Sequence, residues 1–131
     1  MAAVFLNATY DETFRLLLEA RDYLVYEEPF DRRRLSPLER LVLPCEAMRL
    51  TSRLTQVMAW LLVQKAVHAG EISAAEAAAA DHRLAGQAVC RSRELRQTRA
   101  VPPALGRLRD RSYDLYSRVE RLDAMAAART H

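Results

Sequence analysis

Apolar residues recur at helical spacing along several stretches of the chain, and most of these stretches begin with residues that cap helices. The first follows Thr9-Tyr10-Asp11-Glu12, a capping box in which the Thr hydroxyl accepts an amide hydrogen and the Glu reaches back. Its apolar positions run from Phe14 to Val25. Pro29 should end the helix after Glu28, because proline lacks the amide and clashes with the preceding turn.

A second stretch predicts a long central helix over about residues 37–69. Ser36-Pro37-Leu38-Glu39 offers a capping Ser followed by Pro at the first helical position. Gly70 supplies the left-handed residue that commonly follows a helix. Pro44 should kink this helix near its start. Residues 54–67 are apolar on more than one face, which is typical of a helix buried on two sides.

The C-terminal half predicts two more helices. A capping box at Ser73-Ala74-Ala75-Glu76 opens a helix that can run to about Thr98, before Pro102 and Pro103. The alanines of residues 74–80 have little side chain to bury, so this part either packs closely against another helix or frays. A last helix starts near Pro103 and carries the clearest apolar seam, at three-four spacing: Leu105, Leu108, Ser112, Leu115, Val119, Leu122 and Ala126.

Together these patterns predict an all-α domain over residues 1–131. We expect an antiparallel bundle of three to four helices, because the connections on either side of the third helix are short, and loose ends at 1–7 and 124–131. The 22 Ala, 19 Leu and 19 Arg favour helices, and the three scattered glycines exclude a Gly-rich phosphate loop. No stretch reads as a signal peptide or a membrane span, so we expect a cytoplasmic protein.

Charge is unevenly distributed, since residues 1–90 sum to −2 and residues 91–131 to +5. Seven arginines make up the basic patch: Arg91, Arg93, Arg96, Arg99, Arg107, Arg109 and Arg111. The first four complement the dipole at the C-terminus of the predicted third helix, which is a sufficient structural explanation. An alternative is a small basic regulator that grips nucleic-acid phosphates with this patch.

No arrangement of residues predicts catalysis. A carboxylate-bridged metal bundle would need Glu-x-x-His motifs, and none occurs. Cys45 and Cys90 have no metal-site spacing and are expected to be buried, reduced thiols. We therefore expect no catalytic residues, no metal and no cofactor, and rank a metal or thiol enzyme last.

One face of the central helix carries a polar stripe at three-four spacing: Glu46, Arg49, Arg53, Gln56, Trp60 and Gln64. Glu46 can pair with Arg49, and Arg53 could find an acid on the first helix, at Glu19 or Asp22. Three interpretations stay open. The stripe is a solvated surface, a face that docks a partner or a second copy through Trp and Arg, or a buried network that fixes bundle register.

The residues from Glu46 to Glu71 resemble the alphaproteobacterial regulator-of-CtrA-degradation (RcdA) family, which is also classed as a domain of unknown function. Shorter similar pieces are Ala20–Leu24, Leu35–Val42, Arg83–Gln87 and Ser112–Leu122. The resemblance spans about residues 10–123, and its central stretch is the most specific part.

The resemblance implies a small, dimerising helical bundle without catalytic activity that serves as an adaptor of the ClpXP protease. In that family the adaptor joins ClpX primed by a response-regulator-like protein and tethers protein substrates involved in cell-cycle progression, which is compatible with recruitment to the cell pole. The best-known members carry an extended C-terminal tail, whereas this chain ends nine residues after Leu122.

An adaptor needs docking surfaces rather than a pocket, because it acts by raising the effective concentration of two proteins. We therefore hypothesise that the polar stripe is a partner-docking or dimer face. Replacing Arg53 and Trp60 together should then abolish association and leave helicity intact. The exposure of Trp60 is the first observation to make.

Overall fold

The computed structural model describes residues 3–90 and 101–130. Three long helices dominate them: α1 (Ala3–Asp22), α3 (Val42–His68) and α6 (Pro103–Arg129). The shorter elements are a π-helical turn (Tyr23–Glu27), α2 (Glu28–Arg33), a 3-10 turn (Glu39–Leu41), α4 (Ala74–Ala77), a second 3-10 turn (Ala80–His82) and α5 (Gln87–Cys90). The described residues contain no strand, which confirms the all-α class.

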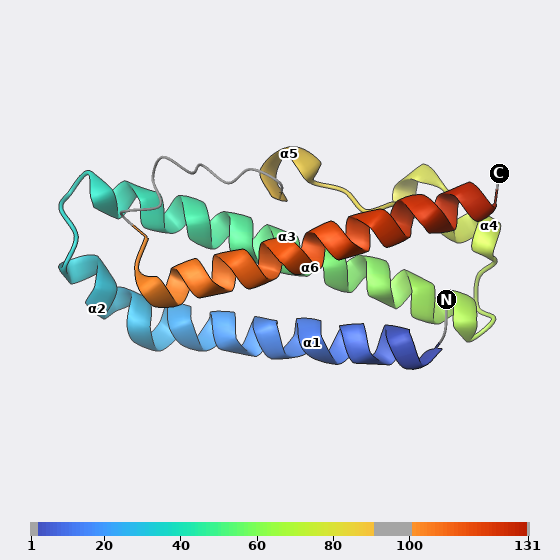
Figure 1. Cartoon of the computed structure of the whole chain (residues 1–131), viewed down its shortest axis with the longest axis horizontal. Helices are drawn as coiled ribbons and strands as arrows, with labels where there is room; N and C mark the ends of the chain where they lie inside the picture. Colours follow the sequence, from blue (N-terminus) through green and yellow to red (C-terminus); the bar gives the residue numbers. More distant parts are fainter. Residues whose placement is uncertain (1–2, 91–100, 131) are drawn as a thin grey trace.

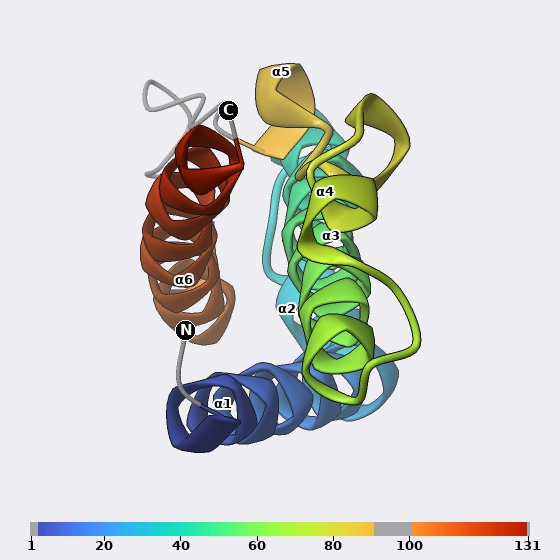
Figure 2. The same ribbon diagram turned by 90° about the vertical axis from the view of Figure 1, so that its right-hand side faces the viewer.

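The central helix α3 packs against both α1 and α6 (Figures 1 and 2). It runs antiparallel to α1, since Lys65 near its end lies over the ring of Tyr10 near the start of α1. It runs parallel to α6, because Arg53 meets Ser112 and, further along both helices, Trp60 meets Asp123. Helix α6 begins near the end of the bundle where α3 began (Figure 1).

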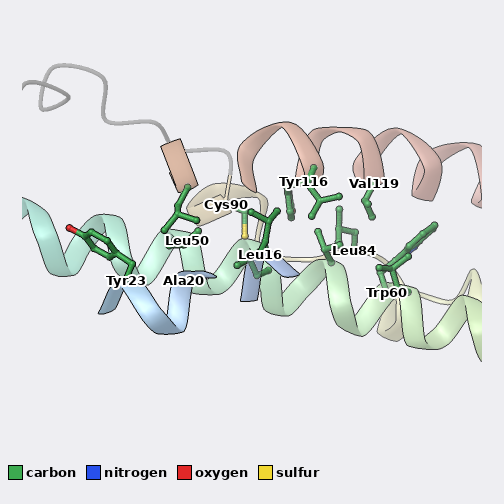
Figure 3. Close-up of a cluster of buried hydrophobic side chains, with 14 of the residues drawn as sticks. Leu16, Ala20, Tyr23, Leu50, Trp60, Leu84, Cys90, Tyr116 and Val119 are labelled. Atoms are coloured by element: carbon green, nitrogen blue, oxygen red, sulfur yellow. The ribbon is translucent and has the colours of Figure 1, made fainter. Parts of the chain in front are cut away.

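The apolar core lies where the three long helices face one another (Figure 3). Leu16 and Tyr23 reach it from α1 and the π turn, Leu50 and Leu61 from α3, and Leu115 from α6, each with 1% or less of its surface exposed. Burying a side chain of this size contributes about 1.5–3 kcal/mol, so this cluster supplies most of the driving force for folding. The expectation that α3 is buried on two sides is confirmed.

The first helix begins earlier than predicted and does not stop at Pro29. The hydroxyl of Thr9 donates to the carbonyl of Phe5, 2.9 Å away, so Thr9 lies inside α1 rather than capping it. Pro29 occupies the first turn of α2, where its missing amide costs nothing. The π turn lies directly before α2, so the helical path continues from α1 to Arg33.

Both ends of the central helix have the capping residues that the sequence predicted. Ser36 and Glu39 form the expected reciprocal capping bonds, at 3.2 and 2.9 Å. The chain then passes through the 3-10 turn, so Pro44 falls in the first turn of α3 and the irregularity predicted there lies just before it. Gly70 has φ +76° and ends α3, with its amide and the next one bonded back to the carbonyls of Val67 and Ala66.

The prediction of a long third helix starting after Ser73 is wrong for the described residues. The Ser73–Glu76 capping box is present, yet α4 lasts only to Ala77. Its alanines have too little apolar surface to hold a long helix in place. Of the two alternatives for this run, close packing or fraying, the short α4 agrees with fraying. Arg83 is extended, and Gly86 at φ +79° breaks the path again before α5. Residues 91–98, the rest of that prediction, lie outside the described part of the chain.

The expected loose ends are helical where they are described. Helix α1 begins at Ala3, and α6 continues to Arg129. Ala127 is 7% exposed, so its last turns pack against the rest of the chain.

Candidate functional site

The polar stripe of α3 points into the bundle, towards α6 and the segment 83–90. Arg53 is 0% exposed, Glu46 1% and Trp60 2%, whereas Arg49, Gln56 and Gln64 are half-buried. A charged side chain is almost never fully buried without partners. Glu46, Arg53 and Trp60 are therefore shielded from solvent, and for these three residues the geometry supports the buried-network interpretation.

Arg53 ties two other parts of the chain to α3. Its Nε donates to the carbonyl oxygen of Cys90 at 2.7 Å, and its NH1 donates to the hydroxyl of Ser112 at 3.3 Å. Its guanidinium carbon also lies 5.5 Å from the ring centre of Tyr113. The sequence suggested Glu19 or Asp22 on the first helix as partners for Arg53. Glu19 instead binds Arg111 on α6, and Asp22 binds Arg21.

Trp60 shares a carboxylate with the segment that follows α4. Its indole Nε1 donates to Oδ1 of Asp123 at 3.0 Å. The Nε of Arg83 donates to both oxygens of the same carboxylate at 2.9 Å. Asp123 is only 5% exposed, so one acid on α6 joins the central helix to Arg83.

Segment 83–90 is held across α3 and α6 at further points. The hydroxyl of Tyr116 donates to the carbonyl of Ala85 at 2.8 Å, while Leu84 is 4% exposed within the core. A Cβ added to Gly86 would lie 3.2 Å from Sγ of Cys90 and 3.5 Å from Cγ of Gln56. Glycine is thus required for both the backbone angle and the close approach.

At the start of the stripe, the ion pair expected between Glu46 and Arg49 is present at 3.2 Å. The second oxygen of Glu46 is buried and has no hydrogen-bond partner among the described residues. The polar network is therefore least satisfied at this end, where an unpaired oxygen is costly.

Side-chain packing and helix capping explain the shifted pKa values of the titratable groups. Burial raises the pKa of the Cys90 thiol, against a smaller opposing effect of the Arg53 charge. Burial and a hydrogen bond to Asp31 raise the pKa of Tyr23. Cys45 is exposed, contrary to the expectation that both thiols are buried. None of these groups forms a nucleophile with a positioned base.

The basic patch is only partly described, because Arg91, Arg93, Arg96 and Arg99 lie outside the described residues. Of the remaining arginines, Arg111 binds both oxygens of Glu19 at 2.8–2.9 Å, and Arg109 pairs with Asp110 at 3.0 Å. The hydrogen bond from Arg111 lowers the pKa of Glu19. These two arginines take part in ion pairs within the chain, so a phosphate would have to compete for them.

Sequence reasoning missed the partners of Arg53 and Trp60 in the stripe. Asp123 lies four residues after Val119 on the buried side of α6. An acidic residue on an apolar helix face indicates that a hydrogen-bond donor is buried beside it, so the sequence could have revealed this partner. The carbonyl of Cys90 could not be predicted as a partner of Arg53, because every residue has a backbone carbonyl and the side-chain pattern does not distinguish one from another.

The fold and this site define a class: a bundle of three long helices in which a buried polar network fastens a short return segment. No group of three or more His, Cys, Asp or Glu in the described residues could hold a metal ion, and no helix there is long and apolar enough to cross a membrane. The chain belongs to the DUF1465 family, described as a protein of unknown function, whose family model matches residues 1–131.

The chain is also similar to a solved structure, the crystal structure of RcdA from Caulobacter crescentus CB15. The two share 33% sequence identity with a TM-score of 0.74, over 94% of this chain and 91% of that chain. The resemblance to the RcdA family is thereby confirmed. No curated protein matches the chain significantly.

Proposed function

We propose that the chain is a non-enzymatic adaptor that tethers protein substrates or regulators to the ClpXP protease in cell-cycle control. The observation that carries this proposal is the similarity to RcdA over 94% of the chain at 33% identity. The adaptor role itself follows from the family resemblance. The proposal includes a homodimer, a response-regulator-like priming partner and recruitment to the cell pole.

The internal site is compatible with such a role. An adaptor gains from a rigid scaffold, because a preorganised surface loses less conformational entropy on binding. In our proposal Arg53 and Trp60 act from within, by fixing α6 and segment 83–90 against α3. The partners then dock on the outer surface, and the stripe supports docking without touching them.

The direct test is a reconstituted degradation assay. The purified chain is immobilised, and native bacterial lysate is passed over it at moderate salt to identify retained proteins. A retained protein is then incubated with ClpX, ClpP and ATP, with and without the chain. We expect ClpX among the retained proteins and faster turnover of the retained substrate when the chain is present.

The control is a heat-unfolded sample of the same chain, which should neither retain ClpX nor speed turnover. Absence of ClpX from the retained proteins, together with unchanged turnover, would contradict the proposal. Retention of nucleic acid that weakens steeply with salt would point to the basic-regulator alternative instead.

A further inference from the structure

The π turn (Tyr23–Glu27) rotates the residues that follow it relative to α1. The buried side of α1 runs through Ala20 and Tyr23, which are 5% and 1% exposed. In an unbroken α-helix this side would next include Glu27 and Phe30, at three-four spacing. In the π turn the amide of Glu28 bonds to the carbonyl of Tyr23, five residues back, so one extra residue is accommodated. Phe30 is thereby carried from the buried side of the helix to the outer side.

The side chains after the π turn follow this rotation. The carboxylate of Asp31 accepts a hydrogen bond from the hydroxyl of buried Tyr23 at 2.8 Å, and the Glu28 side chain is only 13% exposed. By contrast, Phe30 is 59% exposed and Tyr26 68%. Two acids thus lie on the inner side of this stretch and two aromatic rings on the outer side, which is the reverse of the usual arrangement. Single π-helical turns occur frequently at functional sites, and this one places aromatic side chains on the surface.

The exposed aromatic rings belong to a larger apolar region at one end of the bundle. Five of the thirteen large apolar side chains that are exposed in the described residues lie within residues 25–41. They are Val25, Tyr26, Phe30, Leu38 and Leu41. Figure 1 places α2 at this end, outside the packing of the three long helices, and α2 has no buried residue. Concentrated exposed apolar surface is typical of an interaction site.

Positive charge accompanies the aromatic rings at the C-terminal end of α2. Arg33 shares the outer side with Tyr26 and Phe30 at three-four spacing, and we call these three residues the α2 face. The guanidinium carbon of Arg33 lies 5.4 Å from the centre of the Phe30 ring. Arg40 reaches the same end, because its Nε donates to the carbonyl of Arg32 at 3.0 Å. Neither Arg33 nor Arg40 forms an ion pair with any described residue.

The acidic residues of this region are already engaged or face elsewhere. Glu28 accepts from Arg32 at 2.8 Å, and Asp31 accepts the tyrosine hydroxyl described above. Glu39 takes part in the capping bonds before α3, and Glu27 lines a cleft between the π turn and α6. The positive charge of the α2 face is therefore available to a carboxylate from another molecule.

The chemistry of the α2 face identifies the partner that fits it. Aromatic and arginine side chains are enriched among the residues that contribute most to binding in protein interfaces. The two rings offer contact area to an apolar side chain, and Arg33 beside them can donate two parallel hydrogen bonds to a carboxylate. An anionic membrane fits less well, because helices that lie on membranes are rich in basic residues, whereas α2 contains two acids and two arginines.

We propose that the α2 face docks a peptide segment of a partner protein in which an acidic residue lies next to an apolar one. This inference rests on the adaptor function proposed above and deepens it, since it names one docking surface and the chemistry of what docks there. Peptide binding is measured without the protease, and substrate turnover is measured without the peptide. Failure of one proposal is therefore distinguishable from failure of the other.

The test starts from a library of random peptides displayed on phage, which is selected on the immobilised, folded chain. We expect the retained peptides to share an aspartate or glutamate beside a leucine, isoleucine or phenylalanine. One retained peptide is then synthesised with a fluorescein label, and its Kd for the chain is measured by fluorescence anisotropy.

Two substitutions on the α2 face are compared with two matched controls on α6. Phe30→Ala and Arg33→Glu should each weaken peptide binding by about tenfold or more, as expected for residues that anchor an interface. Met125→Ala and Arg121→Glu change a similarly exposed apolar side chain and an exposed arginine elsewhere, and should leave Kd unchanged. Arg33→Glu should also bind a second peptide in which lysine replaces the acidic residues. All four side chains are exposed, so circular dichroism should show the same helicity in every variant.

Three results would overturn the proposal: a selection that retains no peptide, retained peptides without acidic residues, or a Kd that Phe30→Ala and Arg33→Glu leave unchanged. Two other occupants are tested in parallel. If the chain sediments with vesicles of phosphatidylcholine and phosphatidylserine, and Phe30→Ala abolishes this, the α2 face binds a membrane instead. If Phe30→Ala lowers the mass of the chain in analytical sedimentation, the α2 face contacts a second copy instead.

Discussion

Asp123 is the residue whose loss should most clearly reveal the buried network. Its carboxylate accepts from the indole of Trp60 at 3.0 Å and from Arg83 at 2.9 Å, with 5% of its own surface exposed. In Asp123→Ala the indole N–H would stay buried without an acceptor. Arg83 would turn to water, since its side chain is 38% exposed.

The size of the effect follows from these two donors. An unsatisfied buried donor costs about 1–3 kcal/mol. The half-exposed Arg83 pair adds at most about 1 kcal/mol, because solvent screens it. We therefore expect Asp123→Ala to lower the free energy of unfolding by about 2–3 kcal/mol. With an unfolding entropy of about 2.1 cal/mol/K per residue over 131 residues, this is a fall in Tm of roughly 7–11 °C.

Urea unfolding followed by circular dichroism measures the change, and the fluorescence of Trp60, the chain's one tryptophan, reports the site directly. Asp114→Ala, an exposed change on the same helix, should cost less than about 0.5 kcal/mol. In a double-mutant cycle, Trp60→Phe should lose most of its own effect once Asp123 is gone. The reasoning fails if Asp123→Ala is no less stable than Asp114→Ala, or if the two losses simply add.

Three other outcomes are expected. Gly86→Ala should destabilise the chain more than Gly70→Ala: both residues have positive φ, but only the new Cβ at 86 would meet neighbours, and matched thermal melts would show the order. A thiol reagent should label Cys45 quickly and Cys90 only after unfolding, because Cys90 is buried and burial raises its pKa; equal labelling rates would contradict this. The N-cap backbone hydrogen bond lowers the pKa of Glu76 below 4.5, so its contribution is complete above that pH and is lost as pH falls through the lowered value. Hydrogen exchange at α4 should therefore speed up in acid, and Glu76→Gln should remove that dependence.

The stripe on α3 shows what periodicity can and cannot establish. Spacing correctly placed Glu46, Arg53 and Trp60 on one side of one helix, because the helical repeat fixes which residues share a face. It could not say which way that face points, since direction depends on the neighbouring elements. Here Ser112 and Asp123 on α6 supply the partners that let the polar side turn inward.

The third helix shows how propensity can mislead. Alanine has the highest helix propensity, so the run after Ser73 predicted a long helix. Most helical stability in proteins comes instead from packing an apolar face, which a run of alanines largely lacks. Only Ala77 of α4 is buried, and the chain leaves the helix just after it. The helix α6 was predictable for the opposite reason, because Leu105, Leu108 and Leu115 bury large side chains on one seam.

The buried position of Arg53 and Trp60 changes what their replacement would mean. The double substitution was expected to abolish association and preserve helicity, but both side chains lie in the interior and hold other segments in place. Loss of these two side chains should first lower the stability of the bundle. Reduced partner binding by the double variant could therefore result from a loosened bundle and would not show that either residue contacts the partner. Ala59→Arg and Ala124→Arg avoid this ambiguity, because both positions are exposed and neither variant removes an internal hydrogen bond. Assayed for substrate turnover, this pair separates the contribution of the exposed side of α3 from that of the scaffold beneath it.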